Sequence, residues 1–77
     1  MIAINQERQA IELVKVAHKY NGLFIESVET KSGGIWMDMR FDSNADQIAF
    51  NAHVHDNALC KCMKLGDKHS NISSLMI

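Results

Sequence analysis

Four side chains of the kinds that bind zinc lie within ten residues of one another. They are His53, His55, Cys60 and Cys62. Imidazole nitrogens and thiolates are the usual zinc ligands in proteins. If residues 47–55 form a strand and Asp56-Asn57 forms a two-residue turn, all four side chains lie on one face of a hairpin. A flat hairpin would not bring all four within about 2.1–2.3 Å of one ion, so a metal-binding module is an alternative rather than the main expectation.

A helix over the same segment would disperse these ligands. Residues 43–57 then begin with Ser43 as the N-cap and Asp46 at the capping-box position. Because each helical residue advances by about 100°, His53 and His55 point about 200° apart. The helix would bury a narrow apolar stripe made of Ala45, Ile48, Ala49 and Ala52. The alanine content and the cap favour this helix over the strand.

No other group of residues has the pattern of a catalytic centre. Nothing resembling a known nucleophile loop surrounds either cysteine. Asp38 and Asp42 flank Arg40 on one predicted strand, which is typical of solvated surface charges rather than of a desolvated acid–base pair. Gly33-Gly34 matches no phosphate-binding motif. We therefore expect a protein that is not an enzyme, with no cofactor and no small-molecule substrate.

The composition fits one small folded domain. The chain has 77 residues, of which 47% are hydrophobic and 22% are charged. A domain of this size buries only about 60% of its unfolded surface, so its core is thin. The net charge is −1, from 8 basic and 9 acidic residues, which makes nucleic acid an unlikely partner. Lys61, Lys64 and Lys68 form a small basic strip that would support a nucleic-acid-binding domain only as a weaker alternative.

The sequence also predicts the compartment. No apolar run approaches the roughly 18 residues needed to span a bilayer, and Met1-Ile2-Ala3-Ile4 is not followed by the long apolar core of a signal peptide. On a strand, Cys60 and Cys62 would lie about 6.5 Å apart along the chain, beyond comfortable disulfide geometry. Two reduced thiols favour a cytoplasmic protein with no membrane partner.

A helix and a hairpin are predicted for the first half of the chain. Apolar residues recur at helical spacing over 6–20, and Asn21-Gly22 supplies a left-handed stop. Two alternating runs, 23–30 and 34–42, flank the loop Lys31-Ser32-Gly33-Gly34. Pairing Thr30 with Ile35 then sets the register of the hairpin. In this register the face that packs on the helix carries Phe24, Glu26 and Val28 opposite Phe41, Met39 and Met37, and the other face carries Leu23, Ile25, Ser27, Glu29, Trp36, Asp38 and Arg40.

The rest of the chain completes an α+β domain. Residues 58–65 alternate like a strand, and residues 68–77 are either a loosely ordered tail or a final short strand. We therefore expect one domain over 1–77 with an N-terminal helix, a β-hairpin, a second helix and one or two further strands. The strands should form an antiparallel sheet with helices on one or both faces. The alternative is one helix on a four-stranded meander.

Trp36 gives the functional prediction. Together with Arg40, Asp38 and Ile25 it gives one hairpin face the composition of a protein-binding hot spot: an aromatic anchor, an arginine and polar edges. The competing structural role for Trp36 is to pack under the second helix or the C-terminal segment. The sequence thus predicts a small interaction module that acts as an inhibitor, adaptor or regulator of a larger protein. A homodimer is a further possibility. Stand-alone proteins of this size are often encoded by phages and mobile elements.

Overall fold

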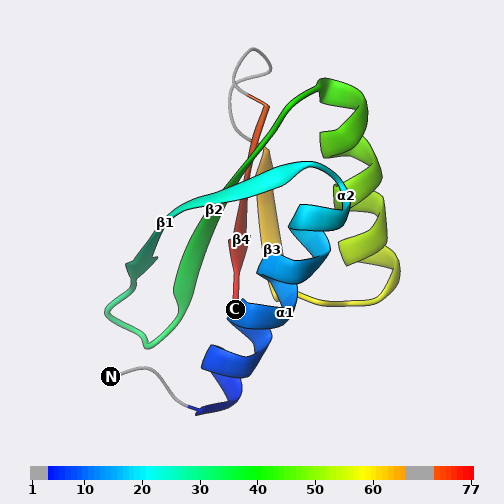
Figure 1. Ribbon diagram of the computed structural model, residues 1–77. Coiled ribbons are helices and arrows are strands. Elements are labelled where there is room, and N and C mark those ends of the chain that lie inside the picture. The colour runs from blue at the N-terminus through cyan, green and yellow to red at the C-terminus, as the bar shows by residue number, and fades with distance from the viewer. Residues whose placement is uncertain (1–3, 66–70) are drawn as a thin grey trace.

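The computed structural model describes residues 4–65 and 71–77. Its elements are α1 (Ile4–Lys19), β1 (Gly22–Glu29), β2 (Ile35–Phe41), α2 (Asn44–Asp56), β3 (Cys62–Leu65) and β4 (Ile72–Met76). The four strands form one antiparallel sheet in the order β1-β2-β4-β3, as can be followed in Figure 1. The predicted α+β class and the predicted order of helix, hairpin and second helix are confirmed. The alternative of one helix on a meander is wrong.

Both helices begin and end on local signals in the sequence. Asn21 follows α1 with a φ of 60°, the left-handed conformation that stops a helix. At the start of α2, the Ser43 side chain accepts a hydrogen bond of 3.1 Å from the backbone N–H of Asp46. Ala58 follows α2 with a φ of 50°. Because these signals are local, the sequence sufficed to predict both helices.

The buried face of α2 differs from the predicted stripe. The helix buries Gln47, Phe50 and Val54, whereas Ile48 is 59% exposed. Ala45, Ala49 and Ala52 are exposed with it. Phe50 and Val54 lie four residues apart and remove far more apolar area from water than alanine methyl groups can. The larger side chains therefore determine which face of the helix is buried.

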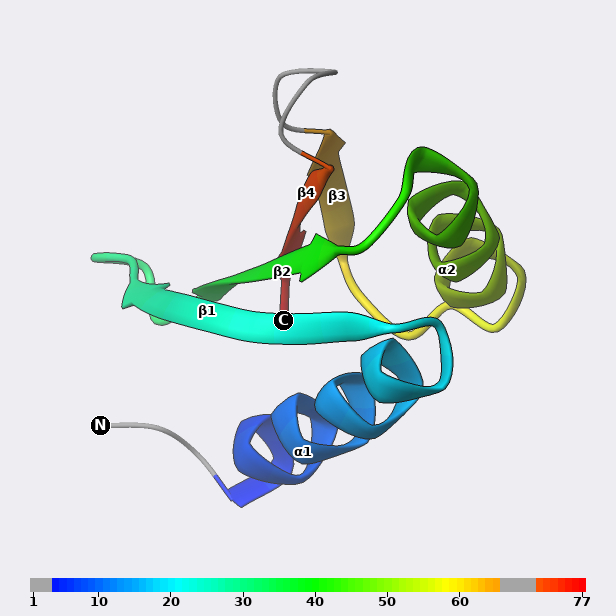
Figure 2. The same ribbon diagram turned by 45° about the horizontal axis from the view of Figure 1, so that its top comes forward.

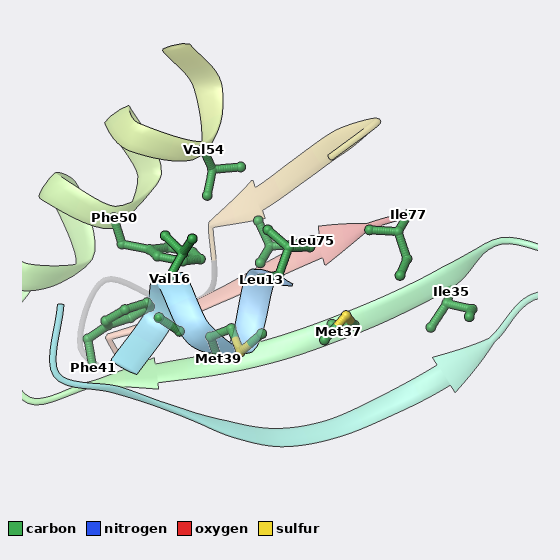
Figure 3. Close-up of a cluster of buried hydrophobic side chains, with 11 residues drawn as sticks. Leu13, Val16, Ile35, Met37, Met39, Phe41, Phe50, Val54, Leu75 and Ile77 are labelled. Atoms are coloured by element: carbon green, nitrogen blue, oxygen red, sulfur yellow. The ribbon is translucent and has the colours of Figure 1, made fainter. Parts of the chain in front are cut away.

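Both helices cover the same face of the sheet. The core joins Leu13, Val16 and Ala17 of α1 to Phe50 and Val54 of α2. Between them lie the β2 residues Ile35, Met37, Met39 and Phe41, with Leu75 of β4 and Ile77, which follows β4. In Figure 2, α1 runs along β1, while α2 stands beside β2 and the paired strands β3 and β4. Figure 3 shows the core side chains of β2 and β4 pointing toward the two helices. The second helix therefore does not cover Trp36.

The register of the first hairpin is one residue away from the predicted register. The N–H of Thr30 donates to the carbonyl of Gly34 over 2.8 Å, so the loop has three residues, and Gly33 takes a φ of 89° within it. Glu29 then lies opposite Ile35, and Ser27 lies opposite Met37. A bulge between Phe24 and Glu26 shifts the register again, which places Phe24 opposite Met39. Ser27 and Glu29 thus share the helix-covered face of β1, in place of Glu26 and Val28.

The last two strands differ from the prediction in their bounds. β3 is shorter than the predicted strand, and the C-terminal residues form a regular strand, β4. The predicted strand over 58–65 becomes β3 at 62–65, because residues 58–61 form the turn after α2. The chain end, which the sequence leaves as either a tail or a strand, forms β4 over Ile72–Met76. β4 pairs with β2 on one side and with β3 on the other. Residues 68–70 lie outside the described residues.

Candidate functional site

In the part of the chain that the structure describes, both helices lie on one face of the sheet and no element covers the opposite face, which we call the open face. Cross-strand pairing arranges its side chains in three rows. The first row contains Val28, Trp36, Met76 and Cys62; the second contains Glu26, Asp38, Ser74 and Lys64; the third contains Leu23, Arg40 and Ile72. The open face therefore combines apolar, acidic and basic groups from all four strands, with Trp36 on a central strand.

Trp36 lies among partners that come from the far half of the chain. The ammonium of Lys64 is 4.7 Å from the centre of the indole ring, a cation–π contact. Met76 lies directly opposite Trp36 on β4. Trp36 is half-buried, so part of the ring still meets solvent. Trp36 is thus partly covered by its neighbours on β3 and β4, which fits the alternative that it packs against the C-terminal segment. The exposed part of its ring still offers apolar surface on the open face.

Polar groups lie in the two rows next to Trp36. The Ser74 hydroxyl donates a hydrogen bond of 2.6 Å to the carboxylate of Asp38, which fixes the carboxylate in place. Glu26 lies directly opposite Asp38 on β1, so two acids face each other across the strands. Arg40 is exposed on the next row. The sequence missed Glu26 because the predicted register placed it opposite Met39 on the other face.

Three of the four predicted binding residues share the open face. Trp36, Asp38 and Arg40 alternate along β2 and point to the same side of the sheet, as predicted. Ile25 instead occupies the bulge of β1, where it has no paired partner on β2 and is 44% exposed. Lys64 and Met76 are the members that sequence reasoning missed, since no local pattern indicates that β4 and β3 lie beside β2.

The candidate zinc ligands are not brought together. His53 faces α1, where a hydrogen bond of 3.1 Å joins its Nδ1 to the Tyr20 hydroxyl. His55 points to solvent beside Asp56, with 3.6 Å between its Nδ1 and the carboxylate. The Cys62 thiol lies 3.6 Å from the sulfur of Met76. Within residues 4–65 and 71–77, no three His, Cys, Asp or Glu side chains are close enough to hold a metal ion.

Cys60 sits in a different environment from Cys62. Burial raises the pKa of the Cys60 thiol above its ordinary value of 9.0, and the neighbouring Cys62 raises it further. A raised pKa leaves less thiolate at neutral pH, and the thiolate is the nucleophile. Cys60 is therefore a poor candidate for an activated catalytic cysteine.

We expect iodoacetamide at pH 8 to alkylate Cys60 more slowly in the folded protein than in urea. The reason is the raised pKa and partial burial of the Cys60 thiol. Trypsin cleavage after Lys61 places the two cysteines on separate peptides, so mass spectrometry can follow each one. Cys62, which is exposed, serves as the internal control. Equal rates for Cys60 in the folded and unfolded chain would contradict this environment.

Two of the three lysines of the predicted basic strip lie within the described residues. Lys61 and Lys64 are exposed, and Lys64 is engaged with Trp36, whereas Lys68 lies outside the described residues. Within the described part of the chain, neither helix has the length and apolar character needed to cross a bilayer.

The open face draws on β1, β2, β3 and β4, so a short motif could not represent it. Comparison of the chain with protein-family models, with characterised proteins and with solved structures finds no match.

Proposed function

We propose that this protein is a non-enzymatic interaction module. It binds a larger protein through the open face and acts as an inhibitor, an adaptor or a regulator of that protein. The observation that carries the proposal is the placement of both helices on one side of the sheet. This arrangement leaves the single tryptophan of the chain half-exposed on a central strand of the other side. A cytoplasmic location and a phage or mobile-element origin fit a protein of this size and cysteine content, and form part of the proposal.

The open face has the anatomy of a binding hot spot. Tryptophan and arginine are the residues most enriched where alanine substitution costs the most binding energy. Trp36 is held on a strand that is paired on both sides, so little backbone entropy is lost when a partner covers it. Lys64 and Asp38 are already fixed by the indole and by Ser74, so the polar rim is also preorganised.

The charges on the open face indicate the chemistry of the partner surface. Glu26 and Asp38 face each other, and a like-charged pair is relieved by a cation placed between the two carboxylates. Arg40 is exposed on the adjacent row and suits a carboxylate in a paired, two-point contact. The complementary surface is thus an apolar pocket for Trp36, followed by a basic group opposite Glu26 and Asp38 and then by an acidic group opposite Arg40, in the order of the three rows.

We expect Trp36→Ala to weaken binding to the protein partner at least tenfold, about 1.4 kcal/mol or more, because it removes the aromatic anchor. The partner is first captured from native cells with a tagged copy and identified by mass spectrometry. Its affinity is then measured by calorimetry. Arg40→Glu should weaken binding as well, and it changes an exposed residue that carries no core contact.

Ile48→Ala is the matched control, because Ile48 is an exposed apolar residue on the helical side of the molecule. Its affinity should equal that of the wild type. Melting curves must show that the open-face variants remain folded. If a captured partner binds both open-face variants as tightly as the control, the open face is not the binding surface. Binding of a single-stranded oligonucleotide that is lost in both variants would favour the nucleic-acid alternative instead.

A further inference from the structure

The exposed apolar side chains of this protein gather along one side. The large hydrophobic residues with the greatest exposure are Ile11, Leu23, Phe24, Ile25, Val28 and Ile48, each between 42% and 61% exposed. Four of the six belong to β1, and Ile11 lies beside β1 on α1. A small domain rarely leaves a strand this apolar in water unless another surface covers it.

β1 is also an edge strand of the sheet, and within residues 4–65 and 71–77 no strand pairs with its outer side. Ile35 exchanges backbone hydrogen bonds with Ile77, the residue after β4. The next residue along β2 therefore directs its backbone N–H and C=O toward β1, and the direction alternates along the strand. Phe24 and Ser27, which lie opposite Met39 and Met37, therefore direct their N–H and C=O groups to the outside. β1 contains no lysine and no proline, which are the residues that usually prevent such an edge from pairing.

A groove joins this edge to α1. It has a volume of about 350 Å³, and its walls include Ile11 of α1 and Phe24 and Ser27 of β1, with Met37 at its base. α1 lies along β1 in Figure 2, and the two are joined by only two residues. A partner that pairs with β1 would therefore also contact α1.

The exposed ridge of α1 is complementary to itself. Glu7 and Lys15 lie four residues before and four residues after Ile11, on the same side of the helix. All three are exposed, and in the described part of the chain neither charged residue has an ion-pair partner. A second α1 running antiparallel about a two-fold axis at Ile11 would place each Glu7 opposite the other copy's Lys15.

The same two-fold axis suits β1. Ile11 shares the groove with Phe24 and Ser27, so the axis crosses β1 midway between these two residues. Antiparallel self-pairing about this point sets Phe24 opposite Ser27 and Leu23 opposite Val28 of the second copy. Phe24 and Ser27 both face the helices and both direct their backbone groups outward, while Leu23 and Val28 both lie on the open face. The bulge makes these faces match, and no glutamate of one copy lies opposite a glutamate of the other.

From these observations we infer that β1 and α1 form a two-fold interface with a second copy of this chain. The two four-stranded sheets join edge to edge into one sheet of eight strands. Leu23, Phe24, Ile25, Val28 and Ile11 are covered in the dimer. The open faces of the two copies lie side by side on the joined sheet, which would present two copies of the surface that contains Trp36.

Sedimentation equilibrium of the full chain tests the interface, because it gives the dimer dissociation constant. We expect the wild type to be dimeric at about 100 µM, in the affinity range of a small interface. Glu7→Lys and Lys15→Glu should each raise the dissociation constant about tenfold, because each places like charges in both symmetric contacts. The double variant restores opposite charges and should recover the affinity of the wild type, a rescue that no general loss of stability could produce.

Ser27→Pro tests the strand pairing. It removes an N–H that points to the free edge and leaves the ladder between β1 and β2 intact, so we expect a folded monomer. A wild type that stays monomeric at about 100 µM, a folded Ser27→Pro variant that still dimerises, or a charge swap that fails to rescue the single variants would each overturn the inference. If Ser27→Pro does not fold, the dissociation constants of the Glu7→Lys, Lys15→Glu and double variants decide whether this interface exists.

Discussion

Replacing Phe50 by alanine is expected to lower the free energy of unfolding by about 3–5 kcal/mol. Phe50 is fully buried, and its ring lies 4.7 Å from the ring of Phe41 and 6.3 Å from that of Tyr20, measured between centroids. The side chain therefore links α2, β2 and the end of α1 at one point. A small domain has a total stability near the lower end of about 5–15 kcal/mol, so this loss would unfold a large part of the population at 37 °C. Urea denaturation followed by circular dichroism measures it.

Ile48→Ala is the matched control, since it truncates a large aliphatic side chain on the same helix. Ile48 is 59% exposed, and alanine has the higher helix propensity, so the change in stability should be within about 0.5 kcal/mol. The pair also tests which face of α2 is buried. If Ile48→Ala were as costly as Phe50→Ala, the helix would pack on its alanine stripe and the observed orientation would be incorrect.

The orientation of α2 shows what a sequence can and cannot predict about a helix. Its existence follows from the cap at Ser43 and the residues after it, which are local. Its buried face depends on the partner surface. Phe50 packs on Phe41, and Gln47 donates hydrogen bonds to the carbonyl of Ile72 and the hydroxyl of Ser73, 3.0 and 3.1 Å away. These partners lie on strands β2 and β4, outside the helix. A count of apolar residues within the helix therefore could not identify them.

The first hairpin shows the same limit at the level of single residues. The alternation of Met37, Met39 and Phe41 correctly predicts which side of β2 is buried. The register of β1 depends on whether the loop has three or four residues, and Gly33-Gly34 permits both. The bulge at Ile25 then reverses the face of every residue before it. Neither feature leaves a distinct signal in the sequence, so Glu26, Ser27 and Val28 were placed on the wrong faces.

Of the predicted binding residues, the sequence placed on the open face correctly only those that lie on a single strand, β2. Trp36, Asp38 and Arg40 share a face because alternate residues of any strand do. Lys64 and Met76 join them because β4 inserts between β2 and β3, which makes the order β1-β2-β4-β3 rather than a meander. Strand order is set by packing across the whole domain, so the neighbours of Trp36 could not be read from its own segment.

Replacing Leu75 by alanine is expected to lower the free energy of unfolding by about 2–5 kcal/mol. Leu75 is fully buried and lies between Met37 of β2 and Met63 of β3. The end of the chain is also fixed, since Ile35 and Ile77 exchange backbone hydrogen bonds of 3.1 and 2.9 Å. Removing the Leu75 side chain leaves a cavity in the middle of the sheet, which these fixed neighbours cannot collapse to fill.

Met76→Ala provides the comparison at the adjacent position of β4. Met76 points to the open face and is only half-buried, so its truncation should cost clearly less than that of Leu75. Both variants keep the backbone pairing of β4, and urea denaturation of each reports the side-chain contribution alone. A frayed terminal segment predicts changes within about 0.5 kcal/mol for both variants. Two such small values would show that β4 is not the strand that holds the two halves of the sheet together.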